Sequence, residues 1–223
     1  MIGRIEDTTS EAAIPDAAAA ASNSSPAKKL PLGFYARPVL TVARECIGKV
    51  LVHRTPEGET AGRIVEAEAY RGPEDRAAHS WRGMTPRTAV MFGPPGRAYV
   101  YLLYGVSWAF NIVTTAEGLP HAVLIRALEP IRGIELMAVR RRQLASAREL
   151  TNGPGKLTQA MSINRADYAR DLCGDELFLE AGVAGQIGRS ARINVERAGE
   201  PWASRPWRFY ERGSQFVSGP RIK

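Results

Sequence analysis

Apolar and polar positions alternate most clearly over residues 62–70, as they do in a strand with one buried face. One face of this strand carries Val65, Ala67 and Ala69. The other carries Ile64, Glu66, Glu68 and Tyr70. Two more strands, 97–103 and 107–115, are separated by Tyr104 and Gly105, which predicts a β-hairpin whose tip falls at Tyr104.

The other periodic segments predict several further elements. They are a short helix running into a strand within 32–52, a strand at 123–128, helices over 131–150 and 156–163, and short strands at 176–180, 191–196 and 207–210. Strands outnumber helices and do not alternate regularly with them. We therefore predict an α+β fold: a single compact domain around a mainly antiparallel, curved β-sheet with flanking helices and a protruding β-hairpin.

Two segments differ in composition from this pattern. Residues 1–30 are rich in Ala and Ser and show no apolar period, so we predict a disordered tail over 1–30 and a folded domain over 31–223. The connection 71–95 is rich in Gly, Pro and Arg, and a connection of this length in a compact domain indicates function.

Composition and net charge limit the classes of protein to which this chain can belong. A hydrophobic content of 44% with 24% charged residues is typical of a globular chain. No apolar run is long enough to cross a bilayer and no secretory or transit signal is readable, so we expect an intracellular protein that does not bind membranes. The two cysteines lack metal or redox spacing. A net charge of +7 indicates a polyanionic partner.

Glu68 and Tyr104 are the first candidates for chemistry. A carboxylate on a strand of Val, Ala and Ile is a candidate base, because desolvation raises its pKa toward neutrality. The alternative is that Glu66, Glu68 and Tyr70 form the solvated face of an edge strand. Tyr104, as an aromatic at a hairpin tip, suggests a wedge or a stacking surface. The alternative is that the tip folds back into the core.

Weaker signals come from the histidines and from two basic segments. His79 lies in the long connection, where it acts on substrate or is an ordinary polar residue; no histidine pair has ligand spacing, so we expect no metal. Residues 153–156 (GPGK) suit a single backbone phosphate at a helix N-terminus, or form a plain turn. Arginines interleaved with aromatic residues over 202–223 predict a polyanion patch, unless the aromatics belong to the core.

Several blocks together resemble the alkyladenine (3-methyladenine) DNA glycosylase family of base-excision repair. The blocks stand in the family's order: 63–70 (RIVEAEAY), 72–75 (GPED), 77–80 (AAHS), 85–87 (TPR), 99–105 (YVYLLYG), 123–130 (VLIRALEP), 153–157 (GPGKL) and 206–210 (PWRFY). The resemblance covers about residues 30–218, and the N-terminal segment lies outside it.

The resemblance implies roles for individual residues. Glu68 becomes the general base that activates water, with His79 and Arg126 positioning that water or the substrate. Tyr70, His79 and Tyr101 enclose the extruded base, and Asn111 excludes guanine-type exocyclic groups. Tyr104 enters the duplex, while Gly153 and Lys156 fall in the segment that contacts phosphate.

The implied activity is that of a monofunctional DNA glycosylase, a hydrolase of N-glycosyl bonds. It flips an alkylated, deaminated or etheno purine out of double-stranded DNA and hydrolyses the bond with water, without a cofactor. No lysine falls at the matched pocket positions, so we expect no lyase activity. We expect a monomer located inside the cell with the DNA, which means the cytoplasm or nucleoid if the source is a bacterium. Two alternatives are a catalytically silent DNA-damage-binding protein and a sugar O-glycosidase using Glu66 and Glu68.

Overall fold

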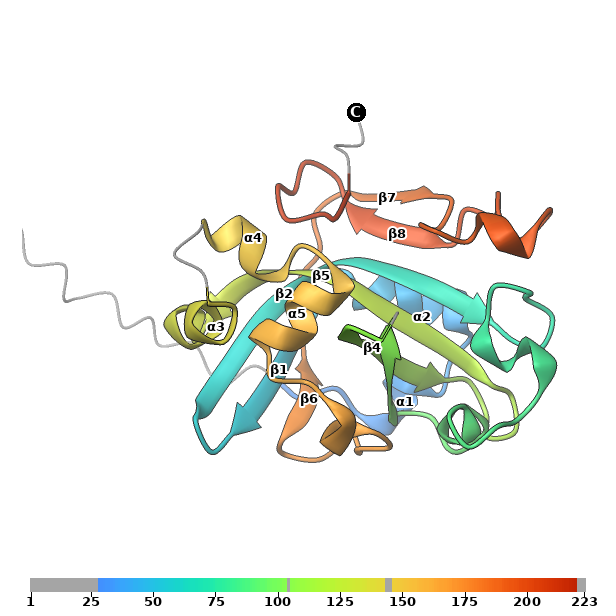
Figure 1. Ribbon diagram of the computed structural model, residues 1–223, viewed down its shortest axis with the longest axis horizontal. Helices are drawn as coiled ribbons and strands as arrows, with labels where there is room; N and C mark the ends of the chain where they lie inside the picture. Colours follow the sequence, from blue (N-terminus) through green and yellow to red (C-terminus); the bar gives the residue numbers. More distant parts are fainter. Residues whose placement is uncertain (1–27, 104, 143–145, 220–223) are drawn as a thin grey trace, which may run out of the picture.

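One antiparallel sheet forms the centre of the α+β domain that the sequence predicted (Figure 1). The computed structural model describes residues 28–103, 105–142 and 146–219. Within these ranges the strands are β1 (Val50–Thr55), β2 (Gly58–Arg71), β3 (Ala98–Leu103), β4 (Ser107–Thr114), β5 (His121–Arg132), β6 (Leu177–Glu180), β7 (Ile187–Ser190) and β8 (Arg208–Glu211). They pair in the order β3-β4-β5-β2-β1-β6, and β8 pairs with both β2 and β7.

Short helices surround this sheet in the described part of the chain. The α-helices are α1 (Leu32–Tyr35), α2 (Val39–Cys46), α3 (Ile134–Arg140), α4 (Ala147–Thr151) and α5 (Pro154–Ala160). The 3₁₀ helices are η1 (His79–Arg82), η2 (Ala89–Phe92), η3 (Arg165–Asp167) and η4 (Glu196–Ala198). Helix α2 buries positions three and four residues apart, Val39, Val42, Ala43 and Cys46, which is the apolar stripe of an amphipathic helix.

Strand β2 explains why residues 66–68 are buried. Its first part pairs with β1, from Thr55↔Gly58 to Val50↔Arg63. Beyond that point β8 takes the place of β1, with Glu66 opposite Tyr210 and Glu68 opposite Arg208. The other edge of β2 pairs with β5 from Ala61 to Arg71. Glu66 and Glu68 therefore stand on a central strand with neighbours on both sides, and the edge-strand alternative is wrong.

Two bulges change which side chains share a face. Between β2 and β5 the register passes from Ile64↔Leu128 to Glu66↔Ala127, and then to Ala67↔Ile125, so Val65 and Arg126 are left without a direct partner. The predicted alternation therefore breaks: Ile64 joins Ala67 and Ala69 in the main core, while Val65 packs in a separate cluster with Ala127 and Phe216. The bulge on β5 also places Arg126 beside the two glutamates, as bulges near sites re-aim a side chain.

The helix predicted over 131–150 is wrong at its start and in its continuity, because the structure has two shorter helices in this range. Residues 131–132 continue β5, because β2 is long enough for Ala61 to pair with Arg132. Gly133 then turns the chain at φ 68°, and a Cβ there would lie 2.3 Å from the Glu59 carbonyl oxygen. Helices α3 and α4 follow as two separate pieces, and residues 143–145 lie outside the description.

Two smaller differences concern the segment after β6 and the N-terminal end of the domain, whereas the hairpin agrees with the prediction. The strand expected at 191–196 is instead β7 at Ile187–Ser190, and the chain leaves the sheet after it. Residues 28–30 are paired: the Leu30 N–H donates to the Leu179 carbonyl at 2.8 Å and Lys29 bridges Glu180. Residues 1–27 lie outside the description. The β3–β4 hairpin is confirmed up to the Leu103↔Ser107 pair.

None of the helices in the described ranges is both long enough and apolar enough to span a bilayer.

Candidate active site

A cavity of about 400 Å³ opens between the hairpin, the long connection and the chain after β7. Five residues selected from the sequence line it: Tyr70, His79, Tyr101, Asn111 and Arg126. They come from β2, η1, β3, β4 and β5. The sheet thus brings together side chains that are more than fifty residues apart in sequence.

Aromatic rings form one wall of the cavity. The His79 ring lies 4.4 Å from the Tyr101 ring, edge to face, and Tyr101 lies 5.3 Å from Tyr99. His79 Nδ1 and the Tyr99 hydroxyl are hydrogen-bonded at 2.8 Å. Partial desolvation of the ring, together with the nearby Arg87 charge, lowers the pKa of His79. The wall is therefore uncharged near pH 7.

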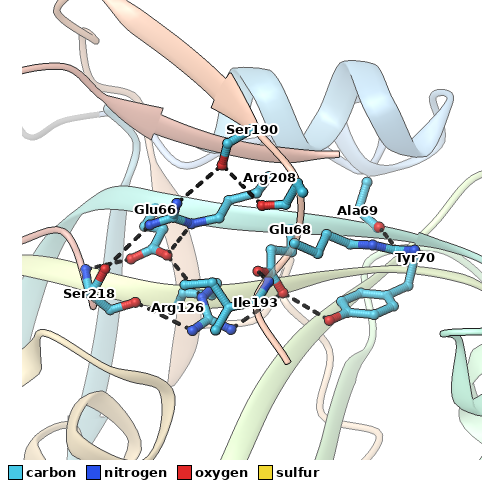
Figure 2. Close-up of polar contacts among 11 residues, drawn as sticks. Glu66, Glu68, Ala69, Tyr70, Arg126, Ser190, Ile193, Arg208 and Ser218 are labelled. Atoms are coloured by element: carbon cyan, nitrogen blue, oxygen red, sulfur yellow. Dashed lines mark hydrogen bonds and ion pairs between the residues drawn. The ribbon is translucent and has the colours of Figure 1, made fainter. Parts of the chain in front are cut away.

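Glu68 lies directly behind the cavity lining and is fully buried (Figure 2). Its Oε2 accepts hydrogen bonds from the Tyr70 hydroxyl at 2.8 Å and from Arg126 Nη1 at 3.3 Å. Its Oε1 accepts the Ile193 N–H at 2.8 Å. Burial raises the pKa of Glu68, and the Arg126 charge with these two other donors offsets part of that rise. The carboxylate is thus held by three groups that themselves line the cavity.

Glu66 supports Arg126 from the side away from the cavity. Glu66 Oε1 accepts from Arg126 Nε at 2.9 Å and from Arg208 Nε at 2.7 Å, and its Oε2 accepts the Ser218 N–H at 2.7 Å. Arg208 is 4% exposed, so the prediction that it belongs to a surface polyanion patch is wrong. The shared strand face of Glu66 and Glu68 was the one sequence signal for this network.

A second buried ion pair, missed by the sequence analysis, fixes the segment that carries Ile193. The Arg192 guanidinium donates to both carboxylate oxygens of Asp75, and both side chains are fully buried. It also donates to the Ala69 carbonyl at 2.9 Å and stacks 4.6 Å from the Tyr70 ring centre. Arg192 therefore ties the Ile193 segment, the end of β2 and the long connection together.

The remaining predicted residues lie on two segments. Asn111 is buried and its Nδ2 donates to the Tyr99 carbonyl at 3.1 Å. Lys156 Nζ donates to Asn152 Oδ1 at 2.8 Å, and Pro154, next to Gly153, lines the cavity. A Cβ on Gly155 would lie 2.4 Å from Ser107 Oγ, so glycine lets α5 approach the base of the hairpin. Tyr104 lies outside the described residues.

No three or more His, Cys, Asp or Glu side chains gather into a possible metal site within the described ranges.

Comparison with known proteins identifies the family of the chain. The family model described as methylpurine-DNA glycosylase (MPG) matches residues 33–215. The chain belongs to the methylpurine-DNA glycosylase family. This glycosylase is therefore a hydrolase of N-glycosyl bonds in DNA repair, and DNA is its partner.

Relatives from several organisms match most of the glycosylase. The chain is 53% identical over 195 residues to a protein of Anaeromyxobacter dehalogenans, a match that spans 86% of this chain and 87% of the relative. It is 52% identical over 191 residues to a protein of Methanocella arvoryzae, which spans 85% and 95% of the two chains. A protein of Desulfitobacterium hafniense is 48% identical over 201 residues, or 86% and 98%. Each bears the name "Putative 3-methyladenine DNA glycosylase".

Proposed function

We propose that this glycosylase flips a damaged purine out of duplex DNA into the aromatic cavity and hydrolyses its N-glycosidic bond by attack of water activated by Glu68. The substrates are alkylated, deaminated or etheno purines, and the product is an abasic site. The observation that carries the proposal is the buried Glu68 carboxylate, held by Tyr70, Arg126 and Ile193 directly behind a cavity with aromatic walls.

The cavity suits a flat base better than a sugar or a peptide. Tyr70, His79 and Tyr101 offer rings on which an extruded base would stack, and stacking on aromatic side chains is worth about 1–3 kcal/mol per base. Because His79 is uncharged near pH 7, it does not repel an alkylated purine that carries a positive charge. Asn111 at the cavity wall is the proposed group that excludes exocyclic substituents of guanine type.

Glu68 fits the role of general base. A carboxylate oxygen accepts two hydrogen bonds, and Oε1 has one protein donor, Ile193 N–H, so it keeps capacity for a water molecule. A carboxyl pKa that burial has raised makes a stronger base than an exposed carboxylate. The negative charge also stabilises the positive charge that develops on the sugar as the bond breaks.

The cavity lining supports hydrolysis without strand cleavage. Lyase chemistry needs an amine that forms a covalent Schiff base with the sugar. The described residues that line the cavity include no lysine, and Lys156 is engaged by Asn152. We therefore propose that the enzyme is monofunctional and that water is its nucleophile.

Two surfaces beside the cavity suit the DNA strands. A groove of about 530 Å³ shares His79, Asn194 and Val195 with the cavity, and it is further lined by Trp81 and three arginines, Arg76, Arg82 and Arg197. Arginines would neutralise phosphates there. On the hairpin, Val106, two residues after position 104, is 86% exposed. An inserted Tyr104 would offset part of the cost of unstacking the damaged base.

The two alternative functions, an O-glycosidase and a silent damage-binding protein, differ from the proposal in the role of Glu66 and in whether the base is released. An O-glycosidase would need Glu66 as its second carboxyl group, but both Glu66 oxygens are engaged by internal donors and Glu66 does not line the cavity. A silent damage-binding protein would bind a lesion without releasing the base. Release of the base therefore distinguishes the proposed glycosylase from a silent damage-binding protein.

The test is a single-turnover assay on duplexes that contain one hypoxanthine, one ethenoadenine or one 3-methylpurine. Half of each reaction is treated with alkali, which cleaves abasic DNA. The proposal predicts cleaved strand after alkali treatment alone. Strand cleavage without alkali would contradict the monofunctional mechanism, and binding without cleavage of any of the three lesions would favour the silent binder.

A further inference from the structure

Glu66 is a fully buried carboxylate that does not line the cavity, and three donors point at it (Figure 2). Arg126 Nε and Arg208 Nε both donate to its Oε1, at 2.9 and 2.7 Å. The Ser218 N–H donates to its Oε2 at 2.7 Å. A buried carboxylate carries a large desolvation cost, which two arginines offset here.

Arg126 is divided between the two carboxylates. Its Nε contacts Glu66 at 2.9 Å and its Nη1 contacts Glu68 at the longer distance of 3.3 Å, while Nη2 reaches Ser218 Oγ at 3.4 Å. An arginine facing one carboxylate usually donates two parallel hydrogen bonds to it. Because Glu66 holds the Nε edge, Glu68 receives only one, longer contact from this guanidinium.

Arg208 holds Glu66 from the opposite side. It stands across from Glu68 on β8, yet its Nε turns to Glu66, and its Nη1 and Nη2 donate to Ser190 Oγ at 3.2 Å and to the Ser218 carbonyl at 3.3 Å. The charged and titratable groups that face Glu68 are thus Arg126 from β5, Tyr70 and Glu66 from β2, and Arg208 from β8, with Arg192 behind the Tyr70 ring.

We propose that Glu66 and Arg208 are positioning residues: together they set how strongly Arg126 binds Glu68, and so how free Glu68 is to take a proton from water. The proposal rests on the proposed role of Glu68 as the base. Glu66 competes with Glu68 for Arg126, and Arg208 limits that competition by supplying Glu66 with a second cation.

The two residues should act in opposite directions. Glu66→Gln removes a negative neighbour and releases Arg126 toward Glu68, so the pKa of Glu68 falls. Arg208→Gln leaves Glu66 dependent on Arg126, which draws Arg126 away from Glu68, so the pKa of Glu68 rises. Each shift should be about one pH unit, the lower end of what a displaced ion pair produces.

The test is a titration of the Glu68 carboxyl carbon by NMR in the full-length protein labelled with ¹³C at glutamate, without DNA. Glu68→Gln identifies the resonance by its disappearance. Glu211→Gln is the matched control, because Glu211 on β8 is also buried and pairs with Arg63 on β2, away from the cavity lining. The control should leave the Glu68 titration unchanged although it alters the net charge as Glu66→Gln does.

Repeating the titration in a protein that also carries Arg126→Lys separates an effect exerted through Arg126 from the direct effect of the Glu66 charge on Glu68. Arg126→Lys keeps a positive charge but lacks the planar fork that bridges two carboxylates. In that background Glu66→Gln should shift the pKa of Glu68 by less than half as much. If Glu66→Gln does not fold, as judged by circular dichroism, Glu66→Asp retracts the carboxylate from Arg126 and should produce a smaller shift in the same direction.

Opposite shifts that shrink with Arg126→Lys support the inference. Shifts in the same direction, no shift, or an equal shift in both backgrounds would overturn it. Because the titration needs no substrate, it is independent of the single-turnover assay. If the wild-type enzyme releases the base but the Glu68 titration does not move in the variants, this inference alone is refuted. If the titration shifts as described but the wild-type protein shows no turnover, the proposed function alone is refuted.

Discussion

The Tyr70 hydroxyl donates a hydrogen bond of 2.8 Å to Oε2 of Glu68, so a residue that lines the cavity also touches the carboxylate behind it. Burial raises the pKa of the Tyr70 hydroxyl, and Glu68 raises it further, so the phenol keeps its proton and donates it. The aromatic wall of the cavity and the proposed catalytic group are therefore linked through the Tyr70 side chain.

Tyr70→Phe should move the acid limb of the pH–rate profile upward. The mutation keeps the ring but removes a donor that stabilises ionised Glu68, and a hydrogen bond to a charged group is worth about 1.5–3 kcal/mol. Because water activation needs ionised Glu68, activity is lost as pH falls through its pKa, and that loss should begin about one to two pH units higher. Single-turnover rates between pH 4.5 and 8 measure this, and a limb at its wild-type position would show that Tyr70 does not tune Glu68.

Asp75→Asn should destabilise the protein strongly. It leaves the Arg192 guanidinium buried without its anion, and breaking a buried pair costs about 3–5 kcal/mol. Urea unfolding followed by tryptophan fluorescence gives the change in free energy of unfolding. Asp175→Asn is the control, since Asp175 is exposed and its pair with Lys29 should contribute nothing measurable. Equal midpoints for the two variants would rule out an anchoring role for the buried pair.

Arg82→Gln should weaken binding to duplex DNA and flatten its salt dependence. Each phosphate neutralised on B-DNA contributes about −0.9 to the slope of log affinity against log salt concentration, so this variant should lose close to one unit. Fluorescence anisotropy between 50 and 200 mM salt measures the slope. Arg189→Gln serves as control, because Arg189 is an exposed arginine on β7 that lines neither the cavity nor the groove. An unchanged slope for Arg82→Gln would remove this groove from the DNA path.

Tyr104→Ala should weaken binding to a lesion duplex by about 1–3 kcal/mol, the value of a lost stacking contact. This prediction rests on the sequence and on the hairpin that β3 and β4 form on either side of position 104. Leu119→Ala, an exposed apolar residue between β4 and β5, should leave affinity unchanged. A 2-aminopurine probe beside the lesion reports flipping, and normal flipping by Tyr104→Ala would exclude the wedge.

Elements defined by local sequence signals were predicted more accurately than features that depend on partners distant in the sequence. The β3–β4 hairpin and the presence of a strand at β2 were predictable, because alternation and turn residues are local signals. The bulges at Val65 and Arg126 were not, since they depend on how β2 and β5 pair. The helix expected at 131–150 failed at Gly133, where the end of β5 and a close contact with Glu59 decide the turn.

In the site, too, individual residues could be selected from the sequence, but contacts between distant residues could not. Glu68, Tyr70, His79, Tyr101, Asn111 and Arg126 were selected from the sequence, and the fold gathers them around one cavity and the carboxylate behind it. The Asp75–Arg192 pair joins residues 117 positions apart, and no local pattern predicts that the two side chains meet. Arg208 was placed in a surface patch because its neighbours alternate basic and aromatic residues, whereas its partner, Glu66, lies 142 positions away.

The most direct test of the central claim compares wild type with Glu68→Gln at pH 7 on one lesion duplex, measuring the single-turnover rate and the dissociation constant separately. Removal of a general base costs about 10²–10⁴-fold in rate. For Glu68→Gln we expect a rate loss of at least about 10²-fold, with affinity for the lesion duplex retained. A loss of less than threefold would contradict the central claim, because Glu68 would then not activate the attacking water.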